Sequence, residues 1–241
     1  MTKITLTILL LVVTLTTISA QNRTYIGAEA AVTHDIYEIA DYGTELKEIP
    51  LINGLWGLNI RQDLNKKVFL EIGLLRKYYN EGIGFKTSGG YSETNAITAW
   101  LIPLRLGTRM NLNKEKIHLV SVLGLVYGIN SDYGYGGGSG FEKVSGGDSI
   151  YYSYTSYYNF SKRLPLIQAG LGLEFKLFQT ALLSLSTNYY AGLKKLIQQD
   201  ITYTVNNGLE QRGTAISKGD TFGLGVALKY PISSIWTKTK D

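Results

Sequence analysis

The sequence of 241 residues contains no cysteine, which excludes disulfide bonds, thiolate metal sites, a cysteine nucleophile and a lipid-modified N-terminal cysteine. It has only two histidines and four prolines. Little material is therefore present for histidine-dependent catalysis, and few residues would interrupt long β-strands. Basic residues are not gathered into runs, so the formal net charge of +5 does not indicate nucleic-acid binding.

Beyond the first twenty residues, the chain has no apolar run long enough for a transmembrane helix. Residues 1–20 have the layout of a secretory signal peptide: Lys3, an apolar run from Ile4 to Ile18, and the small pair Ser19-Ala20 before the expected cleavage point. An uncleaved anchor helix is the weaker alternative, because the run is short and is interrupted by threonines. If the mature chain enters a membrane, it must do so as a closed β-barrel.

The clearest strand pattern runs from Asp220 to Tyr230. Large apolar or aromatic residues alternate there with small or polar ones, so one face of the strand is apolar and the other is polar. The apolar face carries Phe222, Leu224, Val226, Leu228 and Tyr230, and the other face carries Thr221, Gly223, Gly225, Ala227 and Lys229.

Eight segments show this alternation or are rich in strand-forming residues. They are residues 24–32, 52–61, 68–79, 97–110, 117–130, 166–177, 183–192 and 220–230. Short and long connections alternate between them, which predicts an all-β fold: an eight-stranded antiparallel transmembrane up-and-down β-barrel over residues 21–232. Both termini, including a short tail at 233–241, are expected in the periplasm, and the long loops outside the cell. Pro103 predicts a β-bulge, and the facing of residues 117–130 stays open.

A soluble barrel would show the same alternation with inside and outside exchanged. The polar face is rich in glycine, serine and alanine, which suit a crowded interior, while the bulky apolar and aromatic residues suit lipid and its interfaces. This contrast favours the membrane barrel. The predicted lipid-facing residues are Trp56, Trp100, Leu104, Leu171, Phe222, Leu224, Val226, Leu228 and Tyr230.

Charged residues recur on the predicted inward faces. They are Glu29, Arg61, Glu71, Lys77, Arg105, Arg109, Glu174, Lys176 and Lys229. A barrel of eight strands encloses an interior that side chains fill, so these charges predict a plug of ion pairs. A selectivity lining for a small solute is the alternative.

Three segments carry a resemblance to a known family: Ile102–Leu106, Ala169–Phe175 and Gly223–Leu228. With them the chain resembles the small outer-membrane β-barrel proteins common in Bacteroidota, porin-like proteins related in shape to OmpA/OmpX-type barrels. The resemblance implies an outer-membrane location, contact with outer-membrane lipid and lipopolysaccharide, and insertion by the outer-membrane assembly machinery. One departure is that the chain continues past Tyr230, whereas such barrels often end on an aromatic residue.

The predicted function is a non-enzymatic scaffold with a filled lumen that presents four extracellular loops, with an accessory role in type IX secretion as a more specific version. No catalytic, cofactor-binding or metal-binding residue is predicted. A narrow channel is one alternative. A lipid A-modifying enzyme is another, disfavoured because His118 is expected at the periplasmic end and no serine is tied to His34. Residues 131–161, an expected irregular loop rich in glycine and tyrosine, are predicted either to bind an extracellular protein or glycan or to extend a hairpin above the membrane.

Overall fold

The computed structural model describes residues 23–49, 52–80, 82–86, 96–113, 116–131, 134–143, 147–158, 160–177 and 180–232. The predicted signal peptide and the tail at 233–241 lie outside these residues. No helix within the described residues is long and apolar enough to cross a membrane.

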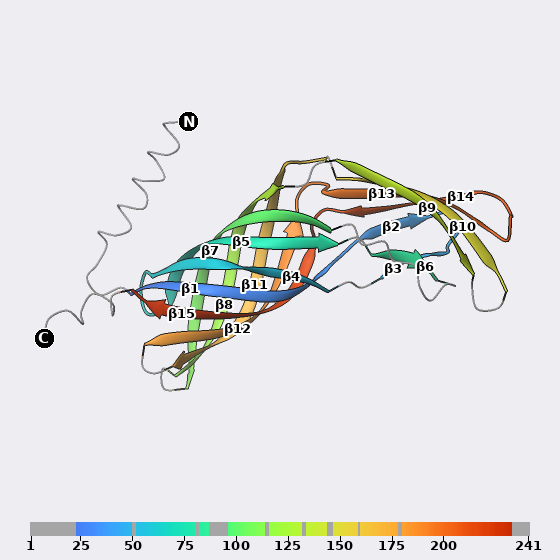
Figure 1. Ribbon diagram of the computed structural model, residues 1–241. Helices are drawn as coiled ribbons and strands as arrows, with labels where there is room; N and C mark the ends of the chain where they lie inside the picture. The colour runs from blue at the N-terminus through green and yellow to red at the C-terminus, as the bar shows by residue number, and fades with distance from the viewer. Residues whose placement is uncertain are drawn as a thin grey trace, which may run out of the picture.

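Eight strands close into an antiparallel barrel, as the alternation predicts (Figure 1). In barrel order they are β1 (Thr24–Asp35), β15 (Thr221–Pro231), β12 (Ala181–Gly192), β11 (Arg163–Leu177), β8 (Ile117–Asn130), β7 (Ala96–Asn113), β5 (Val68–Asn80) and β4 (Ile52–Asp63). Strands β1 and β15 pair with each other, so the first and last barrel strands close the ring. Since every barrel strand has a partner on both sides, the barrel has no free edge.

The prediction of a β-bulge at Pro103 is wrong. Strand β5 pairs with β7 in the same register on both sides of the proline, with Ile72 opposite Leu104 and Leu75 opposite Leu101. The proline removes a backbone donor but inserts no extra residue. The register of β7 instead shifts between Asn111 and Asn113, at the end that leads into the short turn to β8.

The structure resolves the facing of residues 117–130. Leu119, Leu123, Leu125, Tyr127 and Ile129 of β8 are exposed on the outer surface, and Gly124, Val126, Gly128 and Asn130 are buried inside. Both faces carry apolar residues because Val126 packs into an apolar cluster within the barrel. The alternation of polar and apolar residues is therefore weak in this strand, and its sequence alone could not orient it.

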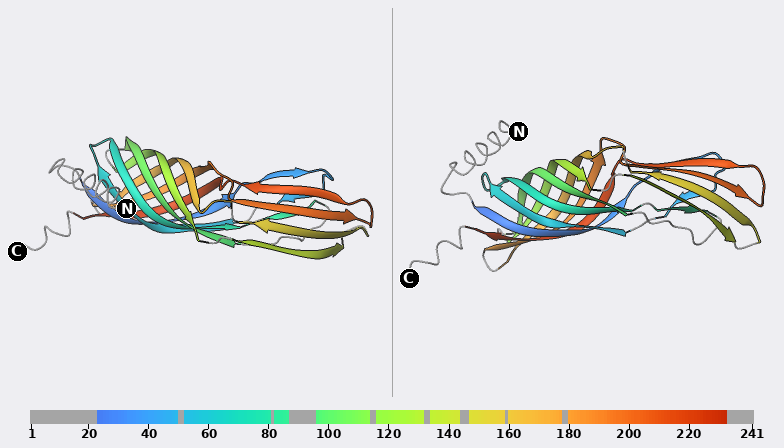
Figure 2. Two further views of the ribbon diagram at one scale, coloured as in Figure 1. Left: turned by 90° about the horizontal axis from the view of Figure 1, so that it is seen from above. Right: turned by 45° about the horizontal axis from the view of Figure 1, so that its top comes forward.

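The long connections are more ordered than the sequence predicts, and the expectation of an irregular loop at 131–161 is wrong. Five segments form a second sheet in the order β2 (Glu38–Asp41), β14 (Gln211–Ser217), β13 (Ile197–Val205), β10 (Ser149–Tyr157) and β9 (Tyr135–Lys143). A two-stranded sheet pairs β3 (Leu46–Glu48) with β6 (Ile83–Phe85). Both sheets extend from one end of the barrel and make the molecule elongated (Figure 2).

The extension has a hydrophobic core of its own. Phe85 of β6 contacts the rings of Tyr152 and Tyr203 from the five-stranded sheet, at centroid distances of 5.5 and 5.3 Å. The buried members of this cluster are Leu46, Ile83, Phe85, Ile150, Tyr154, Ile201, Tyr203 and Ala215. The two sheets thus bury apolar side chains between them, and the extension is a small β-sandwich, which we call the distal sandwich.

Candidate functional site

The middle of the barrel interior is organised around Arg105 of β7. Its guanidinium donates to both oxygens of Glu29 from β1, and to Glu71 from β5, each over 2.7 Å. Nε donates to Gln168 of β11 over 2.9 Å. A two-pronged arginine–carboxylate contact of this kind is among the stronger charge-assisted arrangements. Lys229 of β15 bonds the other oxygen of Glu71 and extends the network to a fifth strand.

A second group of charges lies nearer the barrel end that carries the short turns. Arg61 of β4 is fully buried and pairs with Glu174 of β11 and with Asp63. Arg109 of β7 also pairs with Asp63, over 2.6 Å. The guanidinium carbon of Arg61 lies 3.4 Å from the ring centroid of Phe69, so the cation is packed on an aromatic face as well as paired.

A third pair lies towards the opposite end. The ammonium of Lys77 contacts Asp35 over 2.7 Å and Thr33 over 3.0 Å. Asp35 also accepts hydrogen bonds from Asn53 and Thr221. The carboxylate is therefore fully enclosed by donors from β4, β5 and β15.

The structure brings eight of the nine charges predicted inside the barrel into these three groups. Lys176 is the exception: it is half-buried near the end of β11 and joins none of the ion pairs among the described residues. The sequence reading missed Asp35, Asp63 and Gln168. Asp35 and Asp63 continue the inward alternation beyond the strand ends predicted from the sequence, so longer strands would have revealed them.

The wall facing the long charged side chains carries small residues. Gly170, Gly172, Ser186 and Gly225 line the lumen from β11, β12 and β15. A Cβ added at Gly172 would lie 2.5 Å from the backbone oxygen of Leu185, so this position has no room for a side chain. A cavity of about 70 Å³ remains among the charges, which is room for a few water molecules.

An apolar cluster fills the barrel beyond the central charges. Its buried members are Leu55, Leu75, Tyr79, Ile97, Ala99, Leu101, Val126, Leu164, Leu166, Tyr190, Leu196 and Ile197, with Ala31 and Tyr158 packed against them. Ile197 is the first residue of β13 and Leu196 precedes it, so both belong to the distal sandwich side rather than to a barrel strand. The lumen is therefore closed by a charged layer and an apolar layer in series.

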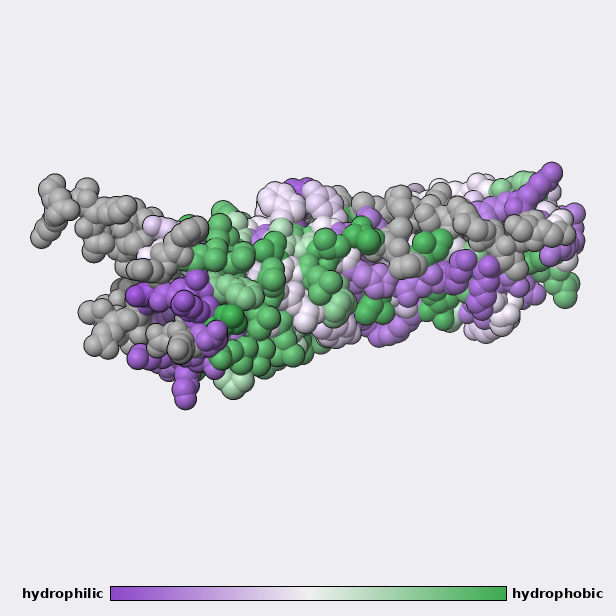
Figure 3. All heavy atoms as spheres, turned by 90° about the horizontal axis from the view of Figure 1, so that it is seen from below, coloured by the Kyte–Doolittle hydropathy of each residue, from purple (hydrophilic) through white to green (hydrophobic). Residues whose placement is uncertain are grey.

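The outer surface of the barrel is the inverse of its interior. All nine residues predicted to face lipid are between 37% and 61% exposed, on outward positions of four strands. Figure 3 shows, on the face in view, a hydrophobic band over the barrel, with hydrophilic surface towards both ends. At the sandwich end of this band, Arg76 lies between Trp56 and Trp100 in the strand register, with its guanidinium carbon 5.4 Å from the Trp100 ring.

The distal sandwich contains a partly buried polar contact at the end of β2. The hydroxyl of Tyr203 donates to Asp41 over 2.8 Å, and Asp41 also accepts the backbone N–H groups of Gly43 and Leu46. Burial, followed by the Asp41 contact, raises the pKa of Tyr203 well above its ordinary value. This contact ties β13 to the turn between β2 and β3.

The two histidines lie towards opposite ends of the barrel. His34 lies 3.7 Å from the carboxylate of Glu48, and His118 is half-buried on the inward face of β8, near its start. In the described part of the chain, no group of three or more histidine, aspartate or glutamate residues is placed to hold a metal ion. The side chains that the structure gathers are suited to filling and stiffening the barrel.

The sequence matches no protein-family model and no curated protein sequence. In shape the chain is similar to outer-membrane proteins. With the outer membrane protein OprG from Pseudomonas aeruginosa it shares 13% identity over 86% of this chain and 96% of the other, with a TM-score of 0.48. With a major outer membrane protein from Thermus thermophilus it shares 8% identity over 88% of this chain and 100% of the other, with a TM-score of 0.44. With the N-terminal β-barrel domain of OprF from Pseudomonas aeruginosa it shares 13% identity over 87% of this chain and 100% of the other, with a TM-score of 0.39.

Proposed function

We propose that the protein is a non-enzymatic outer-membrane β-barrel whose filled lumen serves as a rigid anchor for the distal sandwich, which lies outside the cell. The observation that carries this proposal is the inversion of the barrel: ion pairs lie inside, and leucine, valine, phenylalanine and tryptophan lie outside. In water, the exposed apolar belt would be strongly unfavourable. In a bilayer, the same belt matches the hydrocarbon, and the closed ring of strands satisfies every backbone group.

The charge balance of the lumen supports an anchor rather than a conduit. Among the described residues, five cations face five carboxylates there: Arg61, Lys77, Arg105, Arg109 and Lys229 with Glu29, Asp35, Asp63, Glu71 and Glu174. Such a set has no net charge with which to attract a permeating ion. The apolar cluster above it adds a second barrier that an ion would cross only without its water.

The proposed orientation places the sandwich outside the cell and the short turns in the periplasm. Aromatic and cationic side chains at the sandwich end of the belt support it. Trp56, Trp100 and Arg76 form one group, and Lys195 lies near Phe160 at the same end. Tryptophan suits the lipid interface, and cations suit the phosphates of an anionic outer leaflet such as lipopolysaccharide. The extension would then meet extracellular proteins or glycans.

The proposal is tested by expressing the full chain in a Gram-negative host and fractionating its membranes. A folded barrel should be recovered with the outer membrane and migrate faster on gels when unboiled than when boiled. Protease added to intact cells should cut within residues 135–157 or 197–217 and leave the barrel strands intact. Recovery in the soluble periplasmic fraction without a mobility shift would contradict the proposal.

A narrow channel is the second candidate function, favoured by the small cavity among the central charges. Single-channel recording in planar bilayers separates the two functions. The anchor predicts conductance at the level of protein-free bilayers, and stable unitary currents from the purified protein would favour the channel.

A further inference from the structure

The outer face of the five-stranded sheet has an organisation that packing does not require. Tyrosines alternate along β10, so Tyr152 and Tyr154 enter the sandwich while Tyr151 and Tyr157 point to the opposite face. Strand register places Phe141 of β9 opposite Tyr151, and Tyr135 opposite Tyr157. The hairpin therefore presents aromatic side chains in two separate places on one flat surface.

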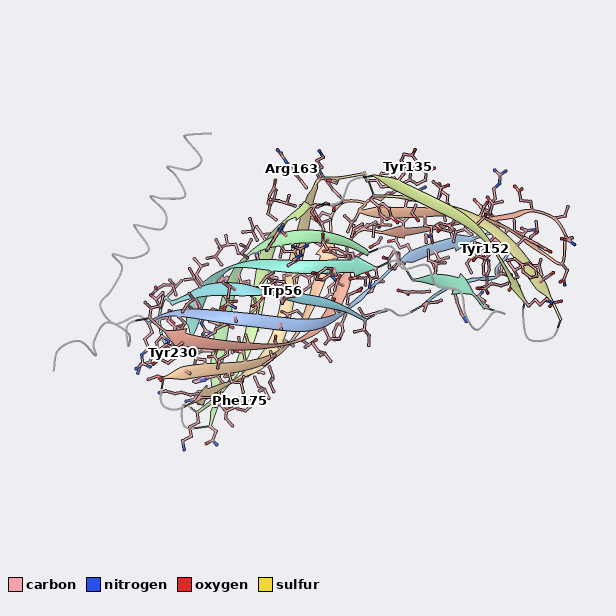
Figure 4. The ribbon with its side chains drawn as sticks, viewed as in Figure 1. Trp56, Tyr135, Tyr152, Arg163, Phe175 and Tyr230 are labelled. Carbon is pink, nitrogen blue, oxygen red and sulfur yellow. The ribbon has the colours of Figure 1, made fainter. Side chains whose placement is uncertain are left out.

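Both places are exposed. Towards the hairpin tip, the rings of Phe141 and Tyr151 lie 4.7 Å apart, and each residue is 46% exposed. Towards the barrel, the ring centroids of Tyr157 and Phe160 lie 6.3 Å apart, and Tyr135 is 79% exposed. Figure 4 shows Tyr135 at the end of β9 nearest the barrel. Six residues of extended strand separate Tyr135 from Phe141, which corresponds to about 20 Å.

The surface between the aromatic groups is small and polar. Gly137 and Thr155 form one cross-strand row there, and Ser139 and Ser153 form the next. Asp200 of β13 lies opposite Thr155 in the strand register, so it extends the first of these rows onto a third strand. Its Oδ1 accepts hydrogen bonds from Gln198 and Thr214, over 2.8 and 2.9 Å, and no described residue donates to Oδ2. A carboxylate oxygen is thus held in place on the half-exposed face and is available to accept further hydrogen bonds.

From this arrangement we propose that the outer face of the sheet binds a neutral polysaccharide. The C–H face of a pyranose ring is apolar and lies flat on an aromatic ring, while the hydroxyl groups around its rim need acceptors and donors. The two aromatic groups supply stacking surfaces about 20 Å apart, and the Ser, Thr and Asp200 side chains between them supply hydrogen-bonding partners. The spacing suits an extended oligosaccharide segment rather than a single sugar.

Other ligand classes fit the surface less well. A stable protein interface is centred on a contiguous, desolvated apolar core, whereas here the apolar groups are divided by a polar floor. The face carries charges of both signs, with Asp200 on β13, Arg212 paired to Glu210, and Lys195 beside Phe160. It therefore offers no uniformly cationic surface to an anionic glycan. A membrane surface is disfavoured because the β9–β10 hairpin reaches away from the barrel (Figure 1), which takes Phe141 and Tyr151 near its tip off the hydrophobic band. The proposal deepens the proposed function, on which it rests for access to extracellular polysaccharide.

Binding is tested with the full-length protein in detergent micelles, after an unboiled gel has shown that the barrel is folded. Affinity electrophoresis in gels containing laminarin, xylan, galactomannan or amylopectin should show retardation by at least one of these polymers. Tyr135→Ala and Tyr151→Ala should each weaken that binding by about tenfold. Asp200→Asn keeps an oxygen for Gln198 and Thr214 but removes the charge, and should weaken binding by a smaller factor.

Tyr42→Ala is the matched control, because Tyr42 is 86% exposed and follows β2, the edge strand of the sheet that lies opposite β9. Its binding should equal that of the wild type. Absence of retardation by all four polymers, or equal retardation of the wild type and both tyrosine variants, would overturn the proposal. Intact cells incubated with the fluorescently labelled polymer separate the two proposals: binding in micelles without binding to cells would refute the orientation and leave the platform standing.

Discussion

Replacing Arg105 with methionine would remove the cation that holds Glu29 inside the barrel. Methionine keeps much of the side-chain volume, so the change tests charge rather than packing. Glu71 would retain Lys229 as a partner, whereas Glu29 would keep only the hydrogen bond from Asn59, at 2.9 Å. The structure therefore identifies Glu29 as the carboxylate left uncompensated.

The expected cost is large because the site is enclosed. Arg105 is 5% exposed, and three of its hydrogen bonds go to carboxylates. Breaking one side of a buried ion pair costs about 3–5 kcal/mol, most of it the penalty of the remaining charge. Adding Glu29→Gln removes that charge, so the double variant should recover about 1–3 kcal/mol relative to the sum of the single variants.

Urea unfolding in phospholipid vesicles measures these free energies, followed by tryptophan fluorescence and by the unboiled gel shift. Glu174→Gln is the control for the second substitution. Glu174 pairs with Arg61 and Arg109 and shares no ion-pair partner with Arg105. Its combination with Arg105→Met should therefore be additive within about 0.5 kcal/mol.

Two results would refute this reasoning. A loss below about 1 kcal/mol for Arg105→Met would mean that the lumen is hydrated well enough to solvate Glu29 alone. The second result is additive losses of unfolding free energy in both double variants, Arg105→Met with Glu29→Gln and Arg105→Met with Glu174→Gln. It would mean that the charges act independently and that the pairing in the structure does not determine stability.

The facing of the strands, the closure of the lumen and the tyrosine contact of the sandwich each give a further prediction. Leu224→Arg should destabilise the barrel in vesicles by about 2–4 kcal/mol if the residue lies near the bilayer midplane. Gly223→Trp should also destabilise it strongly, because a Cβ there would already lie 3.1 Å from the methyl group of Thr33 and the indole would have to enter a filled lumen. Tolerance of both in the vesicle assay would invert the facing. Arg105→Met should leave bilayer conductance at background, because the apolar cluster still closes the lumen; a large current would show that the ion pairs form a gate. The pKa of Tyr203 is raised in the folded sandwich, so its protonated hydroxyl stabilises the fold. This stabilisation is complete below the unfolded pKa of about 10 and is lost progressively as the pH rises above that value. Proteolysis of the sandwich should accelerate above that pH in the wild type, and Tyr203→Phe should weaken this dependence.

The barrel could be predicted from the sequence because its signal is local. Alternation with a period of two places successive side chains on opposite faces whatever the strand's partner. Short and long connections then define the up-and-down order. Strand β8 shows the limit of this reasoning, since both of its faces are apolar and only the packing of Val126 inside the barrel distinguishes them.

The partners of the lumen charges could not be predicted in this way. Arg105 and Glu29 are 76 residues apart, and their contact depends on barrel closure and on the register of every strand between them. A shift of one residue would move either side chain to the outer face. The sequence therefore identified which residues point inward, while the closed barrel determined which carboxylate each cation meets.

The distal sandwich depended still more on tertiary structure. Glycines dominate β9, and a glycine-rich segment has low intrinsic strand propensity, so its sequence indicates a loop. In the structure, Gly138 and Gly140 lie beneath the rings of Tyr154 and Tyr152, where a Cβ would come within 2.7 and 2.2 Å of a tyrosine oxygen. The sequence by itself determined eight strands and, for most of them, the composition of the two faces, because the alternation of side chains is a property of each strand alone. Only the tertiary structure turned its long connections into a second folded body, because their strands are stabilised by partners that are distant in the chain.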